Sequence, residues 1–120
     1  MTQRTDKVSK LARQVLGETI ASLKDPRVGF TTVTSVRVSA DLRHALVFIS
    51  VMGDEEEQKE TMAGLESAKA YLRGQLGREI RMKYTPDLHF ELDHGPEDAQ
   101  RLEAIFRKLH AAESHEETSG

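Results

Sequence analysis

The sequence predicts a single α+β domain in which helices cover a small three-stranded sheet. Three observations lead to this fold class. The chain opens on a long segment whose apolar residues have helical spacing. Two adjacent segments of strand character follow. A second segment with helical spacing then leads into one in which apolar and polar residues alternate, as in a strand. A chain of 120 residues suffices for one domain with a modest core. We expect this domain to span residues 1–110.

The first helix is predicted from about Thr5 to Lys24. Apolar residues recur there at the spacing of one helix face, from Val8 to Leu23. Asp25-Pro26-Arg27 should end it, because proline disfavours helical geometry at the residue before it.

A hairpin follows. Residues 30–39 are rich in β-branched side chains, which predicts a strand. Its apolar residues change from odd to even positions between Val33 and Val36, which predicts a bulge near Thr34-Ser35. Residues 40–43 form a turn, and residues 44–52 form a second strand that is apolar on both faces. Such a strand is expected at the centre of a sheet.

Residues 53–60 are predicted to be a solvated loop, and a helix then runs from about Met62 to Gly77. An extended stretch broken by Pro86 follows, and its second half, around Phe90, is predicted to be the third strand. The last element is a short amphipathic helix containing Leu102, Ile105, Phe106 and Leu109. We expect residues 111–120 to be a disordered acidic tail.

Composition excludes several classes of protein. There is no cysteine, so disulfides, thiolate nucleophiles and cysteine zinc sites are absent. The N-terminus is polar, and the most apolar stretch, 45–52, is too short to cross a bilayer. We therefore expect a cytoplasmic protein with no membrane partner.

Catalytic and metal chemistry find little support in the sequence. His89 and Asp93 share one face of the predicted strand, but that face is opposite Phe90 and should point to solvent. Walker, Rossmann and nucleophile-elbow motifs are absent. We expect no enzyme activity, no cofactor, no metal and no small-molecule substrate.

Basic side chains gather in two parts of the chain although the net charge is −3. Residues 1–53 and 65–90 are basic on balance, and the acid is concentrated in 54–64 and 91–120. The candidates for phosphate contacts are Lys7, Lys10, Arg13, Lys69, Arg73, Arg78, Arg81 and Lys83, with Arg27 and Arg43 as further candidates. An ordinary charged surface would look the same. Since Tyr71 and Tyr84 are the only candidates for stacking on bases, backbone and shape recognition is favoured.

Residues 74–77, GQLG, match the G-x-x-G signature of KH nucleic-acid-binding loops. Leu72 and Leu76 continue one helix face through Gly74, and an extended segment follows. We therefore interpret GQLG as the last turn of a helix, with Gly77 as its capping residue.

Two longer blocks resemble the ribosome-binding factor A family. They are KDPRVGFTTVTSVRVSADLRHALVFISV (24–51) and AYLRGQLGREIRMKYTPDLHFELD (70–93). The resemblance implies a KH-like fold of type II order, α-β-β-α-(kink)-α-β. It also implies a bend at Ala68-Lys69-Ala70, where this chain has Ala70 in place of the family's usual glycine.

The resemblance further implies a factor that binds the immature small (30S) ribosomal subunit and precursor 16S rRNA. Such a factor would assist 16S rRNA 5′-end processing, late subunit maturation and growth in the cold, without catalysis and as a monomer. The alternative is an α+β protein-interaction or dimerisation module that uses an unpaired sheet edge.

Overall fold

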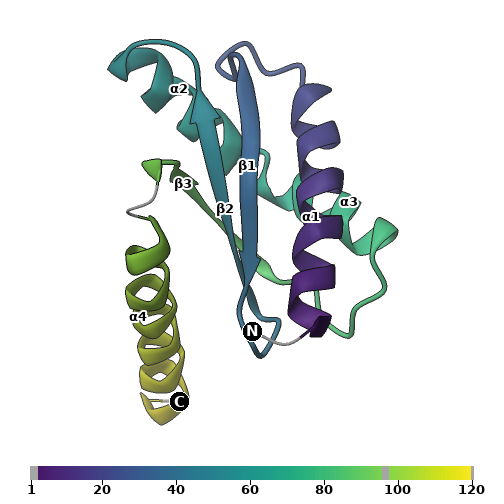
Figure 1. The fold of residues 1–120 in the computed structure, drawn as a ribbon, viewed down its shortest axis with the longest axis vertical. Coiled ribbons are helices and arrows are strands. Elements are labelled where there is room, and N and C mark those ends of the chain that lie inside the picture. The colour runs from purple at the N-terminus through teal and green to yellow at the C-terminus, as the bar shows by residue number, and fades with distance from the viewer. Residues whose placement is uncertain (1–2, 96–97, 120) are drawn as a thin grey trace.

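The sheet has three strands, with β2 at its centre, and helices lie on both sides of it (Figure 1). The computed structural model describes residues 3–95 and 98–119. The elements are α1 Gln3–Ala21, β1 Thr31–Val38, β2 His44–Val51, α2 Glu55–Ser67, α3 Lys69–Glu79, β3 Asp87–Leu92 and α4 Asp98–Ser119. This order confirms the predicted α+β class.

β1 and β2 form an antiparallel hairpin, and β3 pairs in parallel with β2. The register of the hairpin shifts between Val33 and Ser35, which confirms the predicted bulge. Thr34 lies at the shift, and its hydroxyl donates to the Phe48 carbonyl at 3.1 Å. The bulge is therefore tied to the central strand.

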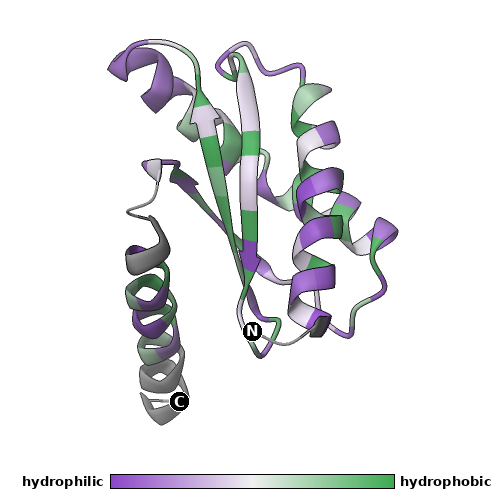
Figure 2. Ribbon diagram, in the orientation of Figure 1, coloured by the Kyte–Doolittle hydropathy of each residue, from purple (hydrophilic) through white to green (hydrophobic). Residues whose placement is uncertain are grey.

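β2 is buried on both faces, as its apolar pattern predicted. Ala45, Val47 and Ile49 belong to the core under the helices, whereas Leu46 and Phe48 alternate with them and are also buried. In Figure 2, β2 is hydrophobic along most of its length, and the start of α2 is strongly hydrophilic.

α1 contributes one apolar stripe to the core, made of Val8, Ala12, Leu16 and Ile20. The helix ends at Ala21, three residues before the predicted end. The amides of Ser22 and Leu23 donate to carbonyls three residues earlier, and the Ser22 hydroxyl donates to the Thr19 carbonyl at 2.8 Å. These bonds tighten the last turn, so the helix stops before Pro26 is reached.

The prediction of a loop over residues 53–60 was wrong, because α2 begins at Glu55. Asp54 caps it through a reciprocal capping box with Glu57, in which the Asp54 carboxylate accepts from the Glu57 amide at 2.9 Å. The acidic run therefore forms the first turns of the helix, where negative charge is favourable.

α2 and α3 meet at Ala68, which lies in the segment where the sequence predicted a bend. Ala68 has φ −89° and ψ 0°, and its amide donates to Gly64 and Leu65 carbonyls, both at 3.1 Å. Leu42 is the only non-glycine residue with positive φ among those the structure describes. The helix break therefore does not require a glycine at Ala70.

Gly74 and Gly77 both lie inside α3, which runs to Glu79. GQLG is thus helical, as predicted, but Gly77 is not the cap; Ile80 ends the helix. A Cβ at Gly77 would lie 3.0 Å from the Thr85 hydroxyl. The glycine leaves room for the segment that returns to β3.

α4 is longer than the short helix that was predicted, and it extends through residues 111–119, where we expected a disordered tail. Alanine and glutamate are strong helix formers and are frequent there. α4 lies on the side of the sheet away from α1 and α3 (Figure 1). Among residues 101–112, whose side chains the structure describes, the half-buried ones are Arg101, Leu102, Ile105, Phe106 and Leu109.

Candidate nucleic-acid interface

The outer face of α1 presents a row of cations. Lys7, Lys10 and Arg13 follow one another at intervals of three residues and are exposed. Arg4 is also exposed and begins the same series. We did not predict Arg4, although its three-residue spacing from Lys7 could have revealed it. The structure places these cations together because Val8, Ala12 and Leu16 hold the opposite face of the helix in the core.

The cations of this row are available for a ligand. Within residues 3–95 and 98–119, none of the four makes an ion pair or a hydrogen bond through its side chain. Lys10 and Arg13 also line a shallow hollow of about 620 Å³, whose other wall includes Thr31 and Thr32 of β1. The row and the hollow together offer charge and hydroxyl groups on one surface.

The two candidates at the start of α3 are already engaged. The Lys69 ammonium lies 2.9 Å from a Glu66 carboxylate oxygen and 5.9 Å from the centroid of the Phe90 ring. The Arg73 guanidinium donates to the Thr85 carbonyl at 2.9 Å and to the Pro86 carbonyl at 3.2 Å. Arg73 therefore anchors the segment that precedes β3.

Arg78, Arg81 and Lys83 are exposed near the end of α3 and on the following segment. The Lys83 ammonium lies 5.5 Å from the centroid of the Tyr84 ring. Tyr84 is 62% exposed, so this pair presents an aromatic face and a charge to solvent. These three cations form a second group, separate in sequence from the α1 row.

Arg27 and Arg43 lie at turns. The Arg27 guanidinium donates hydrogen bonds to both oxygens of the Asp25 carboxylate, the shortest at 2.7 Å, and this lowers the pKa of Asp25 to about 2. Arg43 is exposed in the hairpin turn, where its amide donates to Asp41 at 3.1 Å. The charge of Arg27 is thus largely compensated by its neighbour.

The prediction that His89 faces solvent was wrong in part. His89 is half-buried, and its Nε2 lies 3.0 Å from Nδ1 of the buried His44 on β2. Burial and the neighbouring His44 lower the pKa of His89. The sequence did not show this contact because it depends on the parallel pairing of β2 with β3.

Metal-binding and membrane-spanning features are not found among the described residues. In the described part of the chain, His, Asp and Glu side chains form no group of three or more that could hold a metal ion. None of the helices in those same residues has the length and apolarity needed to span a membrane. The two groups of cations are therefore the candidate site.

These observations define a small α+β domain with an exposed cationic helix. Comparison with known families is more specific: the profile described as ribosome-binding factor A matches residues 4–106. The chain belongs to the ribosome-binding factor A family.

Relatives with this name cover almost the whole chain. A ribosome-binding factor A of Halothermothrix orenii is 41% identical over 119 residues, which are 98% of each chain. Another, from Dictyoglomus thermophilum, is 44% identical over 111 residues, covering 91% of this chain and 90% of the relative.

Solved structures agree with this assignment. The crystal structure of ribosome-binding factor A from Thermus thermophilus is 28% identical with a TM-score of 0.67, and the match covers 73% of this chain and 94% of that one. A homology model of the Thermus thermophilus factor, fitted into a cryo-EM map of a 30S complex with this factor, is 28% identical with a TM-score of 0.59, covering 77% of this chain and 93% of that one.

Proposed function

We propose that this protein binds the small ribosomal subunit and assists its late maturation, including processing of the 5′ end of 16S rRNA. Two findings support the proposal: membership of the ribosome-binding factor A family, and the fit of a Thermus thermophilus member into a map of a 30S complex. The protein acts in the cytoplasm as a monomer and by binding, without catalysis or a cofactor.

The observation that carries the mechanism is the cationic row on α1. Arg4, Lys7, Lys10 and Arg13 have no competing carboxylate partner among the described residues. Such side chains neutralise phosphates and release counterions, which gives affinity without reading bases. Arg78, Arg81 and Lys83 extend the contact to precursor 16S rRNA.

The remaining candidates have smaller roles in this proposal. Arg73 and Lys69 hold the α2–α3 region and the segment before β3, and Arg27 is paired with Asp25. Arg43 lies in the hairpin turn, within the sequence block that carries the family resemblance. We rank the α1 row first because neutralising rRNA requires cations that are free to change partner.

A charge-reversal experiment tests this ranking. We expect Lys7→Glu/Lys10→Glu to weaken co-sedimentation with immature small subunits. The slope of log affinity against log salt should fall by about two, because each lost phosphate contact removes about one unit. The matched control is Lys59→Glu/Lys108→Glu, which reverses two exposed lysines on α2 and α4.

Equal loss of binding in both double variants would show that net charge alone matters and would overturn the assignment to α1. Salt-insensitive self-association without subunit binding would instead favour the dimerisation module. Measuring binding to immature and mature subunits in parallel separates a maturation factor from a general ribosome binder.

A further inference from the structure

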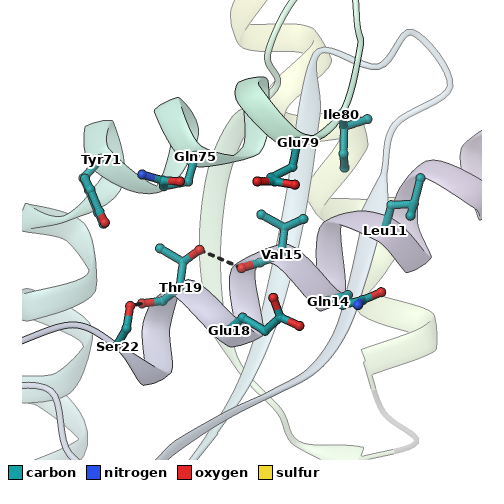
Figure 3. Close-up of a pocket in the computed structure, with 10 residues that line it drawn as sticks. All are labelled: Leu11, Gln14, Val15, Glu18, Thr19, Ser22, Tyr71, Gln75, Glu79 and Ile80. Carbon is teal, nitrogen blue, oxygen red and sulfur yellow. Dashed lines mark hydrogen bonds between the residues drawn. The ribbon is translucent and has the colours of Figure 1, made fainter.

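A groove separates α1 from α3 on a surface that the cationic row does not occupy (Figure 3). Its volume is about 410 Å³. Figure 3 shows Tyr71, Gln75 and Glu79 projecting from successive turns of α3 towards α1, where Val15 and Thr19 point back at them, and Glu18 lies at the outer edge of α1. The groove thus has two helical walls with regularly spaced side chains.

The floor and rim of the groove expose apolar surface. Leu11 is 42% exposed and Tyr71 is 54% exposed, and both are among the few large hydrophobic side chains that the described structure leaves in solvent. Ile80 closes one end and is buried. An exposed aromatic beside an exposed leucine offers a flat apolar contact for a ligand.

The polar side chains of the groove are carboxylates, amides and hydroxyls, and none of its lining side chains is a lysine or arginine. The Thr19 and Ser22 hydroxyls already donate to carbonyls of α1. Glu18 and Glu79 bring two carboxylates, and Gln14 and Gln75 bring two amides. In the described part of the chain these four side chains make no hydrogen bond or ion pair, nor does the Tyr71 hydroxyl. A ligand would therefore meet unpaired acceptors.

We propose that this groove binds an arginine-bearing peptide segment of a protein partner. A guanidinium carries five donors in a plane, pairs with carboxylates and stacks on aromatic rings. Glu18 and Glu79 supply the carboxylates, and Tyr71 supplies the ring. A phosphate backbone fits poorly, because the two carboxylates would repel it. The inference goes beyond rRNA binding and does not depend on it.

The proposal gives α1 two different recognition surfaces. Its outer row carries cations for an anionic ligand, and its edge towards α3 carries acceptors for a cationic one. Gln14 and Glu18 border both surfaces, since each lines the groove and also the hollow beside β1. A partner in the groove would lie next to whatever the cationic row holds.

The test titrates the ¹⁵N-labelled full chain with the peptide acetyl-Gly-Arg-Gly-Arg-Gly-amide and follows backbone amide shifts by NMR. We expect saturable shifts at Glu18, Tyr71 and Gln75. The Glu18→Gln/Glu79→Gln variant should raise the Kd about fivefold, as expected for loss of exposed ion pairs. Tyr71→Leu should raise it about threefold, through loss of the cation–π contact.

Two controls make the result decisive. Glu56→Gln/Glu60→Gln removes two exposed carboxylates from α2, outside the groove, and should leave the Kd unchanged. The same peptide with citrulline in place of arginine keeps the shape and lacks the charge, and it should not bind. An equal effect of both double variants, or equal binding of the citrulline peptide, would overturn the proposal.

A short single-stranded RNA of mixed sequence provides the competing ligand. If this RNA shifts the groove amides and the peptide does not, the groove holds a nucleobase, and the peptide proposal is wrong. The substituted side chains are exposed or line the groove, so far-UV circular dichroism should show the native helix content in each variant.

Discussion

Arg73 has a structural role in the fold that differs from the phosphate-binding role predicted from its place in the sequence. The sequence predicts it as a phosphate ligand because it follows Lys69 at i+4 on a basic helix. In the structure its guanidinium holds the Thr85 and Pro86 carbonyls and lies 3.7 Å from an Asp87 carboxylate oxygen. Reversal of this charge would disturb β3 as well as any contact with RNA.

Replacing Arg73 by alanine should therefore lower the free energy of unfolding. We expect a loss of about 1–2 kcal/mol, since the bonds come from a charged donor but the side chain is partly exposed. Arg78→Ala, at an exposed site on the same helix, should change stability by less than about 0.5 kcal/mol. Urea denaturation measures both, and equal losses would mean that Arg73 has no anchoring role.

The contact between His44 and His89 makes stability depend on pH. The pKa of His89 is lowered in the folded chain, first by burial and then by His44. The unfolded chain therefore binds the proton more strongly. The contribution of His89 is fully present above its unfolded pKa of about 6.5 and is lost as the pH falls below that value.

We expect His89→Phe to lose less stability than the native chain between pH 7 and pH 5. Urea denaturation at pH 7, 6 and 5 provides the comparison. A parallel pH profile for native protein and His89→Phe would show that the histidine pair is not the source.

At the scale of elements, the junction of α2 and α3 is formed without a special backbone conformation. Ala68 alone lies between the two helices, and Ala70 is already part of α3. Glycine at position 70 would therefore relieve no strain. It would only add conformational freedom to the unfolded chain.

Ala70→Gly should destabilise the protein by about 0.5–1 kcal/mol, the usual cost of glycine in a helix. Ala63→Gly, at an exposed position of α2, should cost a similar amount. Thermal or urea unfolding tests this. A more stable Ala70→Gly variant would reveal strain at the junction that its dihedral angles do not show.

The strands could be predicted closely, because β-branched runs and the parity shift at Thr34 are local signals. Helix ends were harder to predict. Asp54 and Glu57 cap α2 through side-chain bonds, and Gly77 lies inside α3, at a point where a Cβ would meet the Thr85 side chain from the next segment. The candidate cations could be recognised by type, but the partners of Arg73 lie across the fold.

At the scale of the whole molecule, α4 covers the face of the sheet opposite the main core. Glu91 of β3 pairs with Arg101 of α4 at 3.3 Å. Leu46 and Phe48 of the central strand point away from α1 and are nevertheless buried. α4 is therefore tied to the sheet by this ion pair, although it follows the other elements of the α+β domain.

Removing residues 98–120 should expose Leu46 and Phe48. We expect a loss of stability on the order of 3 kcal/mol, from the apolar area returned to water, and an increase in binding of a hydrophobic dye. Truncation after Ala112 keeps the side chains of α4 that the structure describes as half-buried and should leave both measurements unchanged. A stable, dye-silent 1–97 chain would show that α4 does not protect the sheet.

The parallel pairing of β2 with β3 has a consequence for the kinetics of folding. The hairpin of β1 and β2 forms between segments that are close in sequence. The pairing of Ala45 with Leu88, in contrast, closes a loop that contains α2 and α3. Closing such a loop is slow compared with forming a hairpin. We therefore expect the third strand to dock late, and until it docks the hairpin has an open edge that can associate with other chains.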